Sequence, residues 1–328
     1  TMLTDSAFAP VSTQAPTITL PYATVPIVGA TLTVTNGFWS GSPLVTGYSY
    51  QWQRSLNNGT TWSNMTLPVD NDNGITADDF TRGQSWYDQA LAVDPANPQN
   101  VLIGGIDLFS SVDAGASWSQ IAKWWDWSGL NCSVVHADQH AICFKPGSSS
   151  TVIFGNDGGV FYSSNIASSA TTKNILARNK NYNVTQFYSA AIHPTAGNNY
   201  HLAGAQDNGT QQFNSASSNS TREVYGGDGG YCFIDQVNSK YQIVSYVNNN
   251  FFLYYPDSNG DTTIMDLIAS ENTGSFINPA CYDNNRHVLY TYKSSDPTTG
   301  GSIYRVKNIT SAPNILLDSL NVTNLTAE

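Results

Sequence analysis

The stretch that decides the fold is Ser111-Val112-Asp113-Ala114-Gly115-Ala116-Ser117-Trp118. A short carboxylate such as Asp113 can accept hydrogen bonds from backbone amides inside a turn, and Gly115 can adopt the positive φ that such a turn requires. Trp118 then places a large apolar ring where it can fold back onto a strand. The stretch therefore predicts a tight turn between two β-strands, in which Ser111, Asp113, Gly115 and Trp118 serve the fold.

The same pattern recurs along the chain at regular intervals. In Ser55-Leu56-Asn57-Asn58-Gly59-Thr60-Thr61-Trp62, Asn replaces the Asp, and Gly59 precedes Gly115 by 56 residues. A weaker copy, Asp257-Ser258-Asn259-Gly260-Asp261-Thr262, places its glycine 145 residues after Gly115, close to three periods of 48. The upstream copy predicts a second turn of this type, formed by Ser55, Asn57, Gly59 and Trp62.

A second, independent repeat is a short apolar phrase that ends in a polar residue, in some copies followed by proline. It occurs at Ala90–Pro95, Ala141–Pro146 and Ala190–Pro194, and in looser form at Tyr231–Asp235 and Ala280–Asp283. The positions equivalent to Asp94 are Lys145, His193, Asp235 and Asp283, separated by 51, 48, 42 and 48 residues. The first four phrases are each followed by a turn and a second apolar run, which is the pattern of a β-hairpin.

Both repeats have the period of one four-stranded propeller blade, for which about 40 to 50 residues are typical. We therefore predict an all-β chain, a β-propeller of four-stranded blades with about six to seven blades, or an incomplete ring of them. Residues 1–15 are predicted to form an N-terminal extension or a closing strand, and residues 16–328 the propeller. Residues 16–66 are interpreted as a blade, with an Ig-like module as the alternative.

The charge and hydropathy of the chain exclude two classes of partner. Thirteen Lys and Arg against 24 Asp and Glu give a formal net charge of −11, so the clustered cations that nucleic acid or an anionic membrane requires are absent from the sequence. No apolar run approaches the ~20 residues needed for a membrane span. Nine Asn-x-Ser/Thr triplets would allow N-glycosylation, but a chain rich in Asn and Thr produces them by composition alone.

Four further phrases lie between the predicted hairpins, at Val135–Ala141, Gly155–Val160, Gly204–Gly209 and Gly226–Gly230. Together with the Ser111–Trp118 stretch, which is similar to the Asp-box signature, they make this part of the chain resemble secreted Asp-box (BNR-like) β-propellers. The resemblance is to sortilin-like and xyloglucanase-like propellers, especially exported Bacteroidetes proteins. It implies an extracellular or outer-cell-surface location, type IX secretion, and other domains or subunits of a larger assembly as partners.

The same phrases contain the candidate ligand-binding residues. His136, Asp138 and His140 alternate along the chain, so in an extended segment they would project from one face and could bind a metal ion or a sugar. A hydrogen-bonded, structural role for the two histidines is the alternative, because no fourth metal ligand can be identified. No cofactor is identified; acidic loop oxygens would suit Ca²⁺ if a metal ion is bound.

Asp138, Asp157, Asp207 and Asp228 are the candidate catalytic residues if the chain is a glycoside hydrolase, which needs one carboxylic acid and one carboxylate base or nucleophile. Hairpin turns favour the same Asp, Asn and Gly residues, so a turn role is the alternative. No complete catalytic constellation is recognisable. The sequence therefore favours a binding or structural module of a larger extracellular protein, with a carbohydrate-active, xyloglucanase-like hydrolase as the alternative.

Tryptophans form the remaining candidate binding surface. Trp124, Trp125 and Trp127, with Trp86 and Tyr87 nearby in the sequence, could stack on sugar rings, or pack in the core as large aromatics usually do. These aromatic residues therefore make a glycan one candidate ligand of the chain.

The four cysteines lack the spacing of a disulfide scaffold. Cys143 and Cys281 occupy the repeat position of Ala92 and Ala191, where a small buried residue is expected. From the sequence alone, a bridge between Cys232 and Cys281 and one between Cys132 and Cys143 are both open.

Overall fold

The computed structural model describes residues 8–14, 18–19, 33–34, 38–42, 53–54, 61, 63–72, 75, 79–126, 129–182, 184–215, 221–270, 273–296 and 300–322. Their regular elements are β-strands and two single-turn 3₁₀ helices, η1 (Ile166–Ser168) and η2 (Ile309–Ser311). In this described part of the chain, no helix has the length and apolar character needed to cross a bilayer. The chain divides into two compact units, residues 1–180 (unit 1) and residues 181–328 (unit 2).

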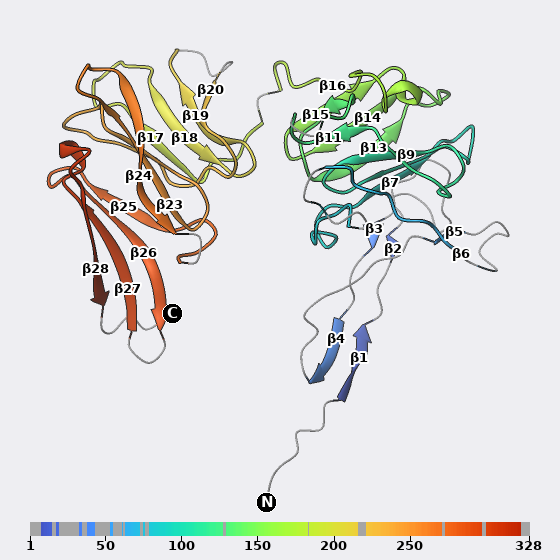
Figure 1. Cartoon of the computed structure of the whole chain (residues 1–328), viewed down its shortest axis with the longest axis horizontal. Helices are drawn as coiled ribbons and strands as arrows, with labels where there is room; N and C mark the ends of the chain where they lie inside the picture. Colours follow the sequence, from blue (N-terminus) through green and yellow to red (C-terminus); the bar gives the residue numbers. More distant parts are fainter. Residues whose placement is uncertain are drawn as a thin grey trace, which may run out of the picture. The chain divides into compact units, whose positions relative to one another are not determined.

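Unit 1 has two four-stranded antiparallel sheets among its described residues, and in each sheet neighbouring strands are consecutive in the chain (Figure 1). The first sheet consists of β7 (Ala90–Val93), β8 (Val101–Gly104), β9 (Leu108–Ser111) and β10 (Ser119–Gln120). The second consists of β13 (Gln139–Phe144), β14 (Val152–Asn156), β15 (Gly159–Ser163) and β16 (Leu176–Ala177).

Shorter strand pairs lie in the same unit. They are β1 (Phe8–Gln14) with β4 (Phe38–Ser42), β2 (Ile18–Thr19) with β3 (Thr33–Val34), β5 (Gln53–Arg54) with β6 (Ser63–Asn64), and the parallel pair β11 (Ala122–Lys123) with β12 (Ser133–Val134). Most of the blade predicted for residues 16–66 lies outside the described residues, including the turn residues Ser55, Asn57, Gly59 and Trp62.

Unit 2 has three four-stranded antiparallel sheets with the same consecutive strand order (Figure 1), counted over its described residues. The first contains β17 (Ser189–Ile192), β18 (His201–Ala205), β19 (Gly209–Phe213) and β20 (Arg222–Tyr225). The second contains β21 (Phe233–Ile234), β22 (Gln242–Ser245), β23 (Asn249–Pro256) and β24 (Thr262–Ser270). The third contains β25 (Ala280–Asp283), β26 (Val288–Asp296), β27 (Gly300–Lys307) and β28 (Leu316–Val322).

The predicted fold class is confirmed, because the chain is all-β and consists of successive four-stranded meanders, the blade architecture of a β-propeller. All five copies of the repeated apolar phrase contribute the first strand of a sheet, namely β7, β13, β17, β21 and β25. The described residues thus contain five complete blades, against about six to seven expected from the period.

The hairpin that opens four of these sheets is closed by one side chain at the repeat position equivalent to Asp94. In each case the side chain accepts a hydrogen bond from the backbone N–H two residues later, as in an Asx turn. The acceptors are Asp94 Oδ1 (2.9 Å), His193 Nδ1 (3.2 Å), Asp235 Oδ1 (2.8 Å) and Asp283 Oδ1 (3.0 Å). In the remaining sheet the equivalent residue is Lys145, whose ammonium group cannot accept a hydrogen bond. There Ser148 Oγ accepts hydrogen bonds from the backbone amides of Ser150 and Thr151 instead.

The turn at Ser111–Trp118 joins β9 to β10, the third and fourth strands of their sheet. Asp113 Oδ1 accepts from the Ser117 N–H at 2.8 Å, and Ser111 Oγ accepts from the Gly115 N–H at 2.8 Å. Gly115 has a φ of +83°, and the Trp118 indole donates to the Thr66 carbonyl at 2.8 Å. Hydrogen bonds from the Ser117 and Ser111 side chains lower the pKa of Asp113 to about 2, so the carboxylate that closes the turn stays ionised.

Neighbouring sheets of unit 2 pack face to face through side chains at alternate strand positions. In β22, Ile243 joins an apolar cluster with Leu289 and Val306 of the third sheet, whereas Val244 joins one with Leu202 of the first sheet. Because adjacent residues point to opposite faces, the middle sheet of unit 2 is buried on both sides.

The first sheet of unit 1 is covered in the same way. Leu102 of β8 packs in a cluster with Phe154 of β14, whereas Ile103 points to the other face and packs with Phe80 and Phe109. Apolar residues on both sides of one strand thus hold the sheet between two layers.

None of the four cysteines, all of which are described, forms a disulfide. The expectation that Cys143 and Cys281 are buried is wrong, because both are exposed. Their neighbours Ile142 and Tyr282 face the adjacent sheet of the same unit and are buried, so the cysteines point away from it. Equivalent repeat positions therefore differ in burial, because the last sheet of each unit is covered on one side only within that unit.

Replacing Asp235 with Ala should destabilise the protein by about 3 kcal/mol, because a buried acceptor is removed from several donors, each costing about 1–3 kcal/mol when left unpaired. Asp235 accepts from the amides of Val237 and Asn238, and its Oδ2 lies 2.5 Å from the Tyr282 hydroxyl and 2.6 Å from His287 Nδ1. Urea unfolding measures the loss. The matched control is Asp283→Ala, an equivalent turn position that lacks the buried partners, and an equal loss in both variants would contradict this account.

Burial acts to raise the pKa of Asp235, but the hydrogen bonds from Tyr282, the turn amides and His287 outweigh it and lower the pKa. A carboxylate with a lowered folded-state pKa stabilises the fold above its unfolded pKa of ~3.9, and this contribution is lost as the pH falls below that value. The difference between wild type and Asp235→Ala should therefore shrink when unfolding is measured at progressively lower pH below 4.

Candidate functional site

The sequence-predicted residues His140 and Asp157 meet on unit 1. His140 lies in β13, and Asp157 lies in the turn between β14 and β15, which the antiparallel pairing brings beside the start of β13. His140 Nε2 and Asp157 Oδ1 are 2.7 Å apart, and the Tyr87 hydroxyl donates to Asp157 Oδ2 at 2.8 Å. The Asp157 carboxylate thus bonds both an imidazole and a phenol, and the three residues come from three separate segments of the chain.

The same group of side chains is electrostatically coupled. The hydrogen bond between His140 and the Asp157 carboxylate raises the pKa of His140, and the negative charges of Asp157 and Asp138 act in the same direction, against burial. The Tyr87 ring meets the imidazole edge to face, with the ring centres 4.9 Å apart. A protonated His140 is therefore stabilised by the neighbouring negative charge.

Trp86 extends this group into an exposed aromatic pair. The rings of Trp86 and Tyr87 lie with their centres 5.5 Å apart, and 68% of Trp86 and 40% of Tyr87 are exposed. Large apolar rings are usually buried, so a pair left in solvent beside an ion pair is a candidate binding surface. We call Trp86, Tyr87, His140 and Asp157 the aromatic site.

A buried carboxyl group lies next to this site. Asp88 has no exposed surface, and neither of its carboxyl oxygens accepts a hydrogen bond from another described residue. Burial, followed by the charge of Asp138, raises the pKa of Asp88 to about 8. Asp88 is therefore a neutral carboxylic acid at neutral pH, a property that no local pattern in the sequence indicates.

The segment that carries His136 and Asp138 is not the extended strand that the metal prediction assumed. Asp138 has a φ of +64°, so the segment is not extended there and the expected alternation of His136, Asp138 and His140 on one face is broken. His136 instead packs against the β14–β15 turn, where a Cβ on Gly158 would lie 2.3 Å from the imidazole Cγ. The glycine of this phrase is thus explained by close packing.

Asp207 and Asp228 both lie in unit 2, in the loops that follow β18 and β20. The Asp207 N–H donates to Asp228 Oδ1 at 3.0 Å, so the Asp228 carboxylate caps a turn amide. A Cβ on Gly204 would lie 2.0 Å from the Gly230 carbonyl oxygen, which shows how closely the loop after β20 approaches β18. This arrangement is the turn role that the sequence left open for Asp228.

A cluster of buried carboxylates in unit 1 was not predicted from the sequence. Asp70, Asp72 and Asp107 each place one Oδ2 atom within 2.9, 2.9 and 3.0 Å of Arg82 Nη2. Burial raises the pKa of Asp107 to about 9; the Arg82 charge opposes this, and the carboxylates of Asp72 and Asp70 add to it. The Arg82 guanidinium and a proton on Asp107 thus compensate the charge of the three carboxyl groups.

These three carboxylates are also close enough to hold a metal ion, because one oxygen from each lies within 4.8 Å of the others. Asp72 Oδ1 and Asp107 Oδ1 are buried without a hydrogen-bond partner among the described residues. They are the oxygens on which a cation such as Ca²⁺ would depend, because Arg82 already occupies the Oδ2 atoms.

Two of the three predicted tryptophans are exposed and adjacent. The rings of Trp124 and Trp125 have centres 5.9 Å apart, and the Arg82 guanidinium lies 5.9 Å from the Trp124 ring centre. Trp127 lies outside the described residues. The described pair does not pack in the core, which had been the alternative.

No family model and no curated protein matches the sequence. Among solved structures, the chain is similar to a luciferin-regenerating enzyme, at 12% sequence identity and a TM-score of 0.30, over 68% of this chain and 73% of that chain. A similarity at this level supports no statement about shared chemistry, and a fold hosts many functions in any case.

Replacing Asp157 with Asn should lower the pKa of His140 toward the ordinary value of ~6.5, because the carboxylate that stabilises the imidazolium is removed. An NMR titration of the five histidine Cε1–Hε1 signals measures this, with His140 assigned by its disappearance in His140→Gln. An unchanged His140 titration in Asp157→Asn would contradict the pairing.

Replacing Asp88 with Asn should stabilise the protein at high pH and leave it nearly unchanged at low pH. The folded-state pKa of about 8 lies above the unfolded value of ~3.9, so ionisation in the unfolded state favours unfolding as the pH rises between these values. Asn mimics the neutral acid and removes this effect. Melting temperatures from pH 4 to pH 9 should diverge up to about pH 8; a constant difference over that range would contradict the raised pKa.

Proposed function

We propose that this chain is an extracellular β-propeller module that binds glycans at the aromatic site and serves as part of a larger protein or assembly. The observation that carries the proposal is the Trp86–Tyr87 pair, which is exposed to solvent yet held in place by the hydrogen bond from the Tyr87 hydroxyl to Asp157.

The chemistry of the site suits a sugar. The apolar face of a sugar ring stacks on an indole or phenol ring, whereas its hydroxyl groups need hydrogen-bond donors and acceptors at the edge. Asp157 supplies an acceptor and His140 a donor when protonated, next to the two rings. Because the hydrogen bond from Tyr87 to Asp157 already fixes the phenol, binding would cost little side-chain entropy.

The extracellular location rests on the resemblance of the turn at Ser111–Trp118. Its Asp113 caps a backbone amide, its Gly115 has a positive φ and its Trp118 is hydrogen-bonded to the chain, which is the arrangement an Asp box requires. This supports placing the chain with secreted Asp-box (BNR-like), sortilin-like or xyloglucanase-like propellers, and export by a route such as the type IX secretion of Bacteroidetes.

One observation favours glycoside hydrolysis as a second candidate function. Asp88 is protonated at neutral pH and lies beside a second carboxyl group, Asp138, and a glycosidase needs a pair of carboxyl groups of which one is protonated. Asp88, however, has no exposed surface, so a glycosidic oxygen cannot contact it in this conformation. Binding without turnover is therefore the function that the geometry supports better.

Replacing Trp86 with Ala should abolish retardation of the protein in native gels that contain a bound polysaccharide, because the most exposed ring of the site is lost. The panel comprises the neutral polysaccharides xyloglucan, mixed-linkage β-glucan and galactomannan, and the melting temperature should stay unchanged because Trp86 contributes little to the core. The control is Phe276→Ala, which removes an exposed ring from unit 2. Equal retardation of wild type and Trp86→Ala would contradict the proposal.

The same panel separates binding from hydrolysis. We expect no release of reducing sugar from any polysaccharide that the wild type binds. Release that persists in Trp86→Ala and disappears in Asp88→Asn would favour the hydrolase over the binding module.

A further inference from the structure

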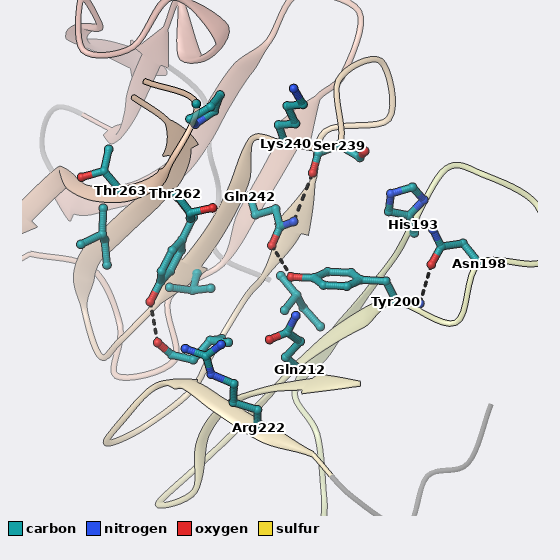
Figure 2. Close-up of a pocket in the computed structure, with 17 residues that line it drawn as sticks. His193, Asn198, Tyr200, Gln212, Arg222, Ser239, Lys240, Gln242, Thr262 and Thr263 are labelled. Atoms are coloured by element: carbon teal, nitrogen blue, oxygen red, sulfur yellow. Dashed lines mark hydrogen bonds between the residues drawn. The ribbon is translucent and has the colours of Figure 1, made fainter. Parts of the chain in front are cut away.

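Unit 2 contains a second candidate site, a pocket of about 790 Å³ between the sheet β17–β20 and the sheet β21–β24. Figure 2 shows that side chains from both sheets and from the turns before β18 and β22 point into it. Its volume is in the range of roughly 300–1,000 Å³ that is typical of small-molecule sites. We call it the inter-sheet pocket.

The pocket is a continuation of the packed interface between the two sheets. Leu202, Val224 and Val244 line it, and all three also belong to or pack against the apolar cluster that holds these sheets together. The walls of the pocket are therefore part of the packed core of unit 2 and are held in place by it.

Cations without partners line the pocket. Arg222 and Lys240 form no ion pair with any described residue. His193 also lines the pocket, but its Nδ1 already accepts a hydrogen bond from the Thr195 N–H. No Asp or Glu is among the lining residues. The chain as a whole has a formal net charge of −11, whereas the side chains that line this pocket carry positive charge and no carboxylate.

Arg222 faces the two phenol groups of the pocket. Burial raises the pKa of Tyr200 and of Tyr254, and the positive charge of Arg222 acts against this in both. The guanidinium therefore lies within electrostatic range of both hydroxyl groups. In Figure 2, Arg222 and Lys240 lie on opposite sides of Gln242.

Neutral polar groups in the pocket are fixed before any ligand arrives. The Tyr200 hydroxyl donates to Gln242 Oε1 at 2.7 Å, and Gln242 Nε2 donates to the Ser239 carbonyl at 3.1 Å (Figure 2). Thr262 and Thr263 add hydroxyl groups from β24. Such a combination of aromatic faces, amides and hydroxyls suits a molecule with many hydroxyl groups.

We propose that the inter-sheet pocket binds an acidic saccharide, a short sugar chain whose carboxylate pairs with Arg222 and whose second anionic group reaches Lys240. A guanidinium recognises a carboxylate through two parallel hydrogen bonds, which makes Arg222 the anchor. The proposal does not depend on the aromatic site, because it rests on different residues in the other unit.

Other ligand classes fit this pocket less well. A neutral sugar would desolvate Arg222 and Lys240 without supplying a negative charge, which is costly. A small inorganic anion would pair with the cations. It would not contact Gln242 or the Tyr200 ring, and it would leave most of the pocket volume empty. A nucleic acid is disfavoured by the acidic charge of the whole chain.

The experiment is calorimetric titration of the full chain with trigalacturonate, with cellotriose as the neutral trisaccharide and with sodium sulfate as the simple anion. We expect trigalacturonate to bind, cellotriose and sulfate to bind at least tenfold more weakly, and the affinity for trigalacturonate to fall as NaCl is raised from 50 to 300 mM. Salt screens the charge pairing that carries recognition.

Arg222→Gln and Lys240→Gln should each weaken trigalacturonate binding at least tenfold. Both side chains belong to exposed residues, so the variants should keep the wild-type melting temperature. The matched control is Lys307→Gln, which removes a cation from β27 outside the pocket and should bind like the wild type.

Three outcomes would overturn the proposal: no heat from trigalacturonate, unchanged affinity in both pocket variants, or equal affinity for cellotriose or sulfate. Trp86→Ala should bind trigalacturonate like the wild type. Loss of binding in Trp86→Ala together with unchanged binding in Arg222→Gln would assign the acidic sugar to the aromatic site and remove it from the inter-sheet pocket.

Discussion

One hydrogen bond, from a backbone amide to a side chain two residues earlier, is the constraint on which the blades depend. It closes the first hairpin at Asp94, His193, Asp235 and Asp283, and it fixes which residues of the first and second strands lie opposite each other. Register then decides which side chains face the neighbouring sheet, because a slip of one residue would turn every side chain to the other face. The packed layers and the pockets between them follow from that register.

The fold was largely predictable because its determinants are local. The spacing of Asp94, His193, Asp235 and Asp283 marks the sheets directly, and the Ser111–Trp118 stretch contains its own hydrogen-bond partners. The exposure of Cys143 was not predictable, because it depends on whether a further sheet covers that face. Repeat position sets the direction of a side chain, but the neighbouring layer sets its exposure.

The candidate sites divide in the same way. His140, Asp157 and the exposed aromatic residues could be predicted as site candidates from the sequence, because histidine, aspartate and tryptophan stand out in a chain rich in Gly, Ser, Thr and Asn. Asp88 and the pairing of Arg82 with buried carboxylates were not, since their properties arise from segments that meet only in the folded chain. The inter-sheet pocket likewise depends on residues distant in the sequence, because Tyr200, directly before β18, and Gln242 of β22 are 42 positions apart and meet only in the folded chain.

The face-to-face stacking of sheets has a consequence for cooperativity. In unit 2 the middle sheet packs against one neighbour through Ile243 and against the other through Val244. If one neighbouring sheet detaches, the middle sheet therefore keeps its packing against the other. In such an array, stability is a sum over adjacent layers, much as in a one-dimensional chain of coupled repeats. Partial opening should therefore begin at an outer layer of the stack and move inward, with β21–β24 protected longest from amide hydrogen exchange.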